Sequence, residues 1–155
     1  MTIEDRLEEM GLALPQPPKP VAAYIPAVAS GGLIFTSGQL PLVEGKLLAS
    51  GLVGDKEGHV DPDAAAGLAQ TAALNALAAI KSEIGSLERV RRIVKVVGYV
   101  ASDSSFTGQP SVVNGASELL GKLFGDAGQH ARSAVGVAAL PLGAPVEVEI
   151  IAEFA

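Results

Sequence analysis

The 155-residue chain has no cysteine and no tryptophan, and aromatic residues make up only 4% of it. Without cysteine, the chain has no disulfide, no thiolate nucleophile and no cysteine-ligated zinc. Proteins that bind single-stranded nucleic acid usually stack the bases on aromatic side chains, and few such platforms exist here. Any catalytic or binding site must therefore use groups other than thiols. Nucleic acid is a disfavoured partner.

Basic residues are also few, with 11 Lys and Arg against 17 Asp and Glu and a formal net charge of −6. They are scattered apart from Arg89, Arg91 and Arg92, whereas a protein that binds polyanions usually presents a basic face. The first nine residues carry four acids, and no apolar run approaches the length of a membrane span. We therefore expect a soluble, cytoplasmic protein with no membrane segment.

The length fits one domain that follows a short N-terminal addition. In residues 1–20 the pattern predicts a helix, capped by Thr2 and closed by Gly11, and then an extended connector with four prolines in "LALPQPPKP". Residues 21–155 are expected to form the single main domain.

The main domain is expected to begin with two strands over residues 21–42 around a turn at residues 30–32, followed by a short third strand in "EGKLLAS". A helix is predicted over residues 61–85 and a second one over residues 110–125. Their apolar faces are Ala73, Leu77, Ile80 and Ile84 in the first helix, and Val112, Ala116, Leu119 and Leu123 in the second.

Between these helices, "RIVKVVGYVAS" is apolar on both faces, as a central strand is, and two more strands end the chain. The order β-β-β-α-β-α-β-β indicates a ferredoxin-like α+β sandwich with both helices on one face of a mixed sheet. The other face of that sheet then needs a cover.

The last 26 residues, "HARSAVGVAALPLGAPVEVEIIAEFA", combine one arginine with three glutamates that alternate with aliphatic residues. Because side chains alternate along a strand, the glutamates share one side and the aliphatic residues face the core. In the preceding strand we expect Val135 and Val137 to face the core, which places Arg132 beside the glutamates if the two strands pair as a hairpin. A guanidinium on a floor of small residues could grip a carboxylate bidentately. The alternative is an ordinary half-solvated sheet without a site.

Four stretches resemble the RidA/YjgF family of reactive-intermediate deaminases, also described as L-PSP endoribonuclease-like proteins. They are "FTSGQLP" at 35–41, "VVNGAS" at 112–117, "ARSAVGVAALP" at 131–141 and "VEVEIIAE" at 146–153. The resemblance spans residues 21–155 and is typical of a longer, less characterised branch. It implies a chorismate-mutase-like α+β fold, assembled as a homotrimer with the open sheet faces inward and the sites between subunits.

The activity implied by the resemblance is hydrolysis of 2-imino and enamine acids to 2-keto acids and ammonia, without a metal or organic cofactor. Arg132 would hold the substrate carboxylate and Glu147 the attacking water, while Tyr24, Ser37 and Asn114 would contact the substrate. Two alternatives stay open. The protein could bind or sense a small 2-keto or carboxylic acid without catalysis, or, against its charge balance, act as an endoribonuclease.

Departures from the family pattern concern the pocket. Ala134 stands where members often carry cysteine, and Ala22 and Ala23 replace a common glycine and proline. These changes bear on pocket shape and substrate range.

The implied site residues also have structural interpretations. Tyr24 could be a half-buried core aromatic, Ser37 could stabilise a turn, and Asn114 could face solvent. His59 and His130 do not indicate a metal site, since two histidines without thiols are too few ligands, although His130 could touch the mouth of the pocket.

Overall fold

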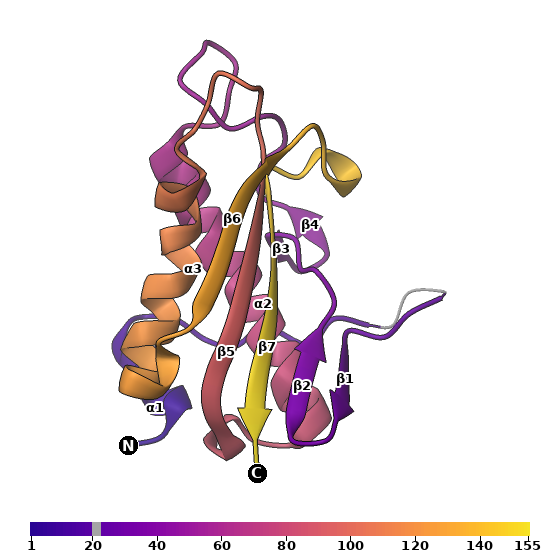
Figure 1. The fold of residues 1–155 in the computed structure, drawn as a ribbon, viewed down its shortest axis with the longest axis vertical. Coiled ribbons are helices and arrows are strands. Elements are labelled where there is room, and N and C mark those ends of the chain that lie inside the picture. Colours follow the sequence, from indigo (N-terminus) through magenta and orange to yellow (C-terminus); the bar gives the residue numbers. More distant parts are fainter. Residues whose placement is uncertain (20–22) are drawn as a thin grey trace.

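The computed structural model describes residues 1–19 and 23–155; Val21 and Ala22, at the start of the first predicted strand, lie outside the described residues. A five-stranded sheet in the order β1-β2-β7-β5-β6 forms the centre of the molecule (Figure 1). Neighbouring strands are antiparallel except for β5 and β6, which are parallel. The strands are β1 (Ala27–Ser30), β2 (Leu33–Thr36), β5 (Val90–Ala101), β6 (Ala131–Val137) and β7 (Val146–Phe154).

Two helices, α2 (Pro62–Ile84) and α3 (Gln109–Phe124), cover one face of this sheet (Figure 1). The N-terminus of α2 is capped by Asp61, whose carboxylate accepts hydrogen bonds from two backbone N–H groups, and Gly85 ends the helix with a positive φ of 91°. All eight residues predicted for the two apolar helix faces are buried. The predicted α+β sandwich with both helices on one face is confirmed.

Glycine allows close packing at two points, one between the two helices and one between the sheet and α3. A Cβ atom added at Gly115 of α3 would lie 1.8 Å from the carbonyl oxygen of Ala66 in α2, and one added at Gly98 of β5 would lie 2.4 Å from a methyl of Val113. A larger residue at Gly115 would push the backbones of the two helices apart, and one at Gly98 would displace the side chain of Val113. The glycine of "VVNGAS" therefore serves the packing of the two helices.

The N-terminal helix α1 (Ile3–Glu9) packs on the same core through Ile3 and Leu7. Thr2 and Asp5 exchange hydrogen bonds in a capping box, and the Thr2 backbone N–H that donates to the Asp5 carboxylate is the main cause of its lowered pKa. Arg6 donates from Nη1 to the carbonyl oxygen of Leu123 at the end of α3. The N-terminal helix is present as predicted, and it contacts the helical layer formed by α2 and α3.

Two details of the first half differ from the prediction. "EGKLLAS" does not give one extra strand, because β3 (Leu42–Val43) and β4 (Lys46–Leu47) pair with each other in a separate ribbon. The first strand begins only at Ala27, directly after Pro26, whose nitrogen cannot donate to a ladder.

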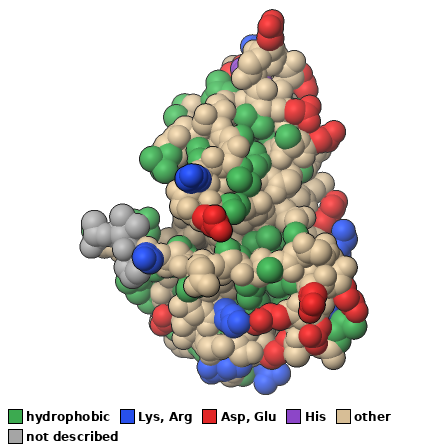
Figure 2. Space-filling view, turned by 180° about the vertical axis from the view of Figure 1, so that it is seen from behind, with side chains coloured by type: hydrophobic (Ala, Val, Ile, Leu, Met, Phe, Trp, Pro, Cys, Tyr) green, Lys and Arg blue, Asp and Glu red, His purple; other side chains and the backbone are tan. Residues whose placement is uncertain are grey.

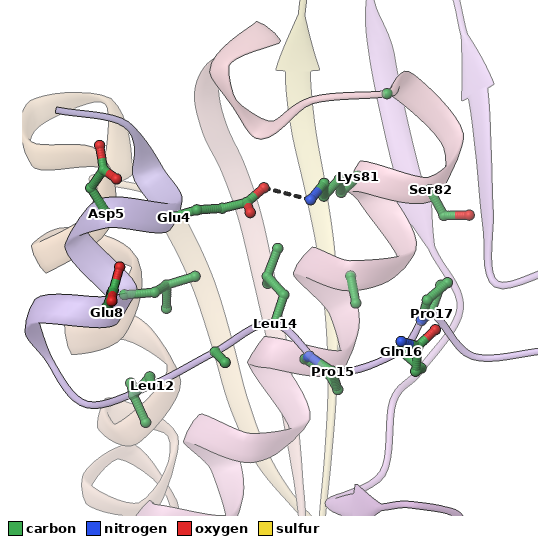
Figure 3. A pocket seen from close by; sticks show the side chains of 14 residues that line it. Glu4, Asp5, Glu8, Leu12, Leu14, Pro15, Gln16, Pro17, Lys81 and Ser82 are labelled. Carbon is green, nitrogen blue, oxygen red and sulfur yellow. Dashed lines mark ion pairs between the residues drawn. The ribbon is translucent and has the colours of Figure 1, made fainter.

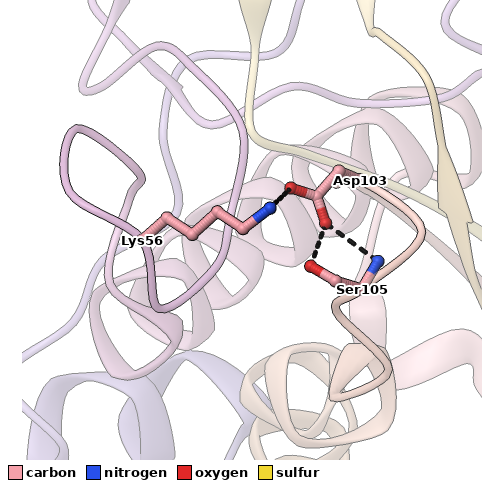
Figure 4. Close-up of polar contacts among 3 residues, drawn as sticks. All are labelled: Lys56, Asp103 and Ser105. Atoms are coloured by element: carbon pink, nitrogen blue, oxygen red, sulfur yellow. Dashed lines mark hydrogen bonds and ion pairs between the residues drawn. The ribbon is translucent and has the colours of Figure 1, made fainter.

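The glycine-rich loop before α2 is tied to the loop that follows β5. Lys56 Nζ lies 3.0 Å from Asp103 Oδ2, and the backbone N–H and hydroxyl of Ser105 both donate to the other carboxylate oxygen (Figure 4). These contacts, led by the Ser105 hydroxyl, hold the pKa of the Asp103 carboxyl well below its usual range. This surface contact joins two loops at the same end of the sheet.

Candidate functional site

Arg132 lies on the face of the sheet that the helices cover. It stands opposite Val96 of β5, which in turn stands opposite Ile150 of β7, and both of these residues are fully buried. Residues directly opposite each other in adjacent strands share a face. The expectation that Arg132 lies on the glutamate side is therefore wrong within one chain.

The error has two physical sources. First, β6 and β7 do not form a hairpin, because β5 lies between them and pairs with both. Second, the helix side of β6 carries small residues because α3 crowds it: a Cβ atom added at Gly136 would lie 2.7 Å from Gln109 Nε2. Val135, expected in the core, points to the other face and is 43% exposed.

The guanidinium of Arg132 is held by side chains of α3. Its Nη1 donates to Asn114 Oδ1 at 2.8 Å and to Ser117 Oγ at 3.2 Å. The sequence resemblance predicted that Asn114 and Arg132 share a site, and they lie in contact. Ser117 was missed, although it follows Asn114 by three residues and so lies on the same side of the helix.

His130 extends this group of hydrogen bonds. Its Nε2 lies 2.9 Å from Ser117 Oγ and its Nδ1 lies 2.6 Å from the carbonyl oxygen of Gly128. We call the four side chains of Asn114, Ser117, His130 and Arg132 the arginine cluster. It lies at the edge of the sheet, between β6 and α3.

Glu147 lies on the opposite face, against which none of the described helices packs and which is here called the open face. Its carboxyl group packs against Gly38, where an added Cβ atom would lie 2.7 Å from Cδ and 2.8 Å from Oε1 of Glu147. Burial raises the pKa of this carboxyl, and repulsion from Glu149 raises it further. The glycine of "FTSGQLP" thus makes room for the carboxyl that the family resemblance singles out.

Tyr99 completes the polar group on the open face. It stands opposite Glu147 in the sheet, and its hydroxyl donates to Glu149 Oε1 at 2.8 Å. This hydrogen bond, with burial and the two carboxylates adding to it, raises the pKa of Tyr99 to about 12. Sequence reasoning missed Tyr99, since it looked like one more apolar residue of a central strand. We call Gly38, Tyr99, Glu147 and Glu149 the glutamate cluster.

Ser37 and Tyr24 lie on the segments that border the glutamate cluster. Ser37 Oγ donates to the carbonyl oxygen of Ile25 at 2.6 Å, which fastens the chain next to Gly38 to the segment that carries Tyr24. The Tyr24 side chain is 56% exposed, so it is not a core aromatic of this chain. The five predicted residues therefore divide into two groups, Arg132 with Asn114 and Glu147 with the segment of Ser37 and Tyr24.

Two hollows are found in the described part of the chain, and the second borders the glutamate cluster through Glu149. One of about 930 Å³ lies between α1, residues 12–17 and α2, beside the ion pair of Glu4 with Lys81 (Figure 3). The other, of about 170 Å³, lies on the open face beside Phe35, Lys95 and Glu149. Neither is lined by Arg132 or Glu147.

The described part of the chain contains no group of three or more His, Asp or Glu side chains placed to hold a metal ion. Among its helices, none combines the length and the apolar character that crossing a membrane requires.

The fold and the two clusters define an α+β sandwich with an arginine on its edge strand and carboxylates on its open face. The family model described as "YjgF/chorismate mutase-like, putative endoribonuclease" matches residues 4–154. The chain therefore belongs to the YjgF family, as the four sequence motifs indicated.

Similar proteins come from several organisms. Protein TCP17 of Trypanosoma cruzi is 40% identical over 148 residues, which cover 95% of this chain and 91% of that protein. A crystal structure of a protein of unknown function from Agrobacterium tumefaciens superposes with a TM-score of 0.91 at 44% identity and covers 99% of this chain and 92% of its own. A crystal structure from Shewanella oneidensis, which is also described as that of a "putative endoribonuclease", superposes with a TM-score of 0.93 at 33% identity. The match covers 99% of this chain and 100% of that chain.

Proposed function

We propose that this protein hydrolyses 2-imino acids and their enamine tautomers to 2-keto acids and ammonia. The observation that supports the proposal most is that the chain carries both groups the reaction needs: a guanidinium whose hydrogen-bond partners among the described residues are neutral, and a half-buried carboxyl whose pKa is raised. Such a guanidinium is free to bind a carboxylate, and such a carboxyl accepts a proton more readily than an ordinary glutamate does.

The proposed reaction adds water across the C=N bond. Arg132 binds the substrate carboxylate and fixes the position of the imine carbon, which is already electrophilic. The Glu147 carboxylate takes a proton from water as the oxygen bonds to that carbon. The proton then passes to the nitrogen, which gives a neutral carbinolamine. The proton of its hydroxyl group moves through Glu147 to the amino group, the C–N bond breaks, and ammonia leaves as the C=O bond forms. Protons and electrons balance without a metal or organic cofactor.

The opposite placement of Arg132 and Glu147 leads us to propose that the site forms between copies of the chain. The family resemblance implies a homotrimer with the open faces inward, and in it the edge strand of one copy would lie against the open face of the next. The open face supports this assembly, since it exposes apolar side chains: Val135, opposite Tyr99 in the sheet, is 43% exposed, and Val28 of the edge strand β1 is 49% exposed. A neighbouring copy would cover these apolar side chains.

The experiment supplies the proposed substrate as it forms. A pyridoxal-phosphate dehydratase acting on serine or threonine releases the enamine and imine, and their decay is followed with and without the purified protein. We expect the protein to accelerate the decay well beyond buffer and beyond an equal mass of albumin. No acceleration at saturating protein would contradict the proposal.

Two parallel measurements identify the alternatives. Calorimetric binding of pyruvate without any acceleration of imine decay would favour a carboxylate-sensing protein. Cleavage of labelled RNA that disappears in Arg132→Ala would favour the ribonuclease description. We expect no cleavage, because on the face drawn in Figure 2 the Lys and Arg side chains lie in small separate groups beside acidic ones.

A further inference from the structure

The hydrogen bonds of Arg132 use one end of its guanidinium. A guanidinium has five N–H donors, and both bonds that Arg132 makes among the described residues come from Nη1. The two hydrogens of Nη1 are thus engaged, which leaves the Nε hydrogen and the two hydrogens of Nη2. Nε and Nη2 form an edge of the planar group that can bind both oxygens of a carboxylate.

The groups that hold Arg132 carry no charge. The acceptors are an amide oxygen of Asn114 and a hydroxyl oxygen of Ser117. The ion pairs found in the described part of the chain, Lys56 with Asp103 and Lys81 with Glu4, do not involve Arg132. A carboxylate in place of either acceptor would neutralise the guanidinium and compete with an incoming acid. Neutral acceptors fix its position and leave its charge available.

The direction of the hydrogen bonds through Ser117 follows from the backbone. The carbonyl oxygen of Gly128 can only accept, so His130 Nδ1 carries the hydrogen that points to it. In neutral His130 the Nε2 atom is then an acceptor, and the Ser117 hydroxyl donates to it. The Ser117 oxygen therefore turns its lone pairs toward Arg132.

We infer that Ser117 and His130 are positioning residues: a relay from the Gly128 carbonyl through His130 and Ser117 holds Arg132 with its Nε and Nη2 edge free for a substrate carboxylate. The inference rests on the proposed function only in naming that carboxylate. His130 fixes the hydroxyl of Ser117, and Ser117 and Asn114 fix the guanidinium. Neither Ser117 nor His130 takes part in bond making.

Steady-state kinetics of imine hydrolysis tests this role. Ser117→Ala removes one hydrogen bond to Arg132, so we expect KM to rise about three- to tenfold with kcat nearly unchanged. His130→Ala should also raise KM, by about twofold, because the Ser117 hydroxyl is still present but is no longer oriented by His130. Ser117→Thr keeps the hydroxyl and should restore most of the wild-type KM.

Ser111→Ala is the matched control, since Ser111 lies on the exposed side of the same helix. Ser111→Ala should leave both KM and kcat unchanged. A Ser117→Ala variant that is folded and has the wild-type KM would overturn the inference, and so would a loss confined to kcat.

Nitrogen NMR of the full-length protein decides the inference even if the protein does not hydrolyse imines. In the wild type we expect a slowly rotating Arg132 guanidinium with separate Nη signals, and neutral His130 protonated on Nδ1. In Ser117→Ala the Nη signals should merge, while Ser111→Ala should match the wild type. Identical Arg132 signals in wild type and Ser117→Ala, or a neutral His130 protonated on Nε2, would refute the relay. Failure of the proposed function would instead show as absent catalysis with these NMR signatures intact.

Discussion

The arginine cluster and the glutamate cluster lie on opposite faces of one sheet and treat their charged groups in opposite ways. Neutral acceptors hold Arg132 at a partly exposed edge, where its full charge remains available. Glu147 is half-buried beside a second carboxylate, and the pKa of its carboxyl is raised. If the proposed function holds, the arginine cluster binds the anion and the glutamate cluster transfers the proton, so the two tasks lie on different faces of the chain. Variants of each cluster should therefore fail in different ways.

The largest effect is expected from Glu147→Gln. The amide keeps the size of the side chain but cannot accept a proton, so kcat for imine hydrolysis should fall about 10²- to 10⁴-fold. The affinity for pyruvate, measured by calorimetry, should stay within about twofold, because Arg132 is untouched. Equal losses in both measurements would mean that Glu147 binds the substrate rather than acting on water.

Arg132→Ala should show the reverse pattern. Removal of two charge-assisted hydrogen bonds should weaken pyruvate binding and raise KM on the order of 10²-fold. Arg132→Lys retains the charge but not the planar fork, so it should fall between the alanine variant and the wild type. Pyruvate binding that survives Arg132→Ala would remove the anion-binding role from the arginine cluster.

Gly38→Ala should disturb the glutamate cluster without touching the arginine cluster. The added methyl would lie 2.8 Å from Oε1 of Glu147, so the carboxyl must move. A misplaced proton acceptor should lower kcat about tenfold with little change in pyruvate affinity. Gly121→Ala is the control, since nothing lies within 4 Å of the Cβ atom added there. A Gly38→Ala variant with wild-type kcat would show that the position of Glu147 is not critical.

The smallest effect is expected from Glu149→Gln, as a shift in the pH dependence of kcat/KM. Glu147 must be ionised to accept a proton, so activity should fall as the pH drops through its raised pKa. Glu149→Gln removes the repulsion that contributes to this shift, so the acidic limb of the kcat/KM profile should move to lower pH. If the acidic limb stays in place or moves to higher pH, the limb reports the titration of a group other than Glu147.

The same titration affects stability with a fixed sign. Because folding favours the protonated form of Glu147, this residue contributes stability at acidic pH that is lost as the pH rises through the raised pKa. Thermal unfolding of the wild type and Glu147→Gln should therefore differ more at neutral pH than at acidic pH, with the glutamine variant the more stable of the two.

Much of this fold could be predicted from local sequence signals. Asp61 and Gly85 delimit α2 as expected, and the alternation in "VEVEIIAE" correctly places Glu147 and Glu149 on the face away from the core. These signals are local: a cap, a helical period and a strand period depend on residues a few positions apart.

The strand order could not be predicted in the same way. The position of β5 between β6 and β7 depends on contacts between distant segments, and the face of Arg132 follows from that order. The motif residues Gly38 and Gly115 also gain their meaning only in three dimensions, where one receives the Glu147 carboxyl and the other receives α2. Ser117 and Tyr99 were missed because nothing in their local sequence distinguishes them.

The most direct test of a site shared between copies is a mixing experiment with two inactive variants. Arg132→Ala and Glu147→Gln are unfolded together, refolded as a one-to-one mixture and assayed for imine hydrolysis. If Arg132 of one copy acts with Glu147 of the next, random mixed trimers should regain about a quarter of the wild-type activity. A mixture no more active than the separately refolded variants would contradict the account.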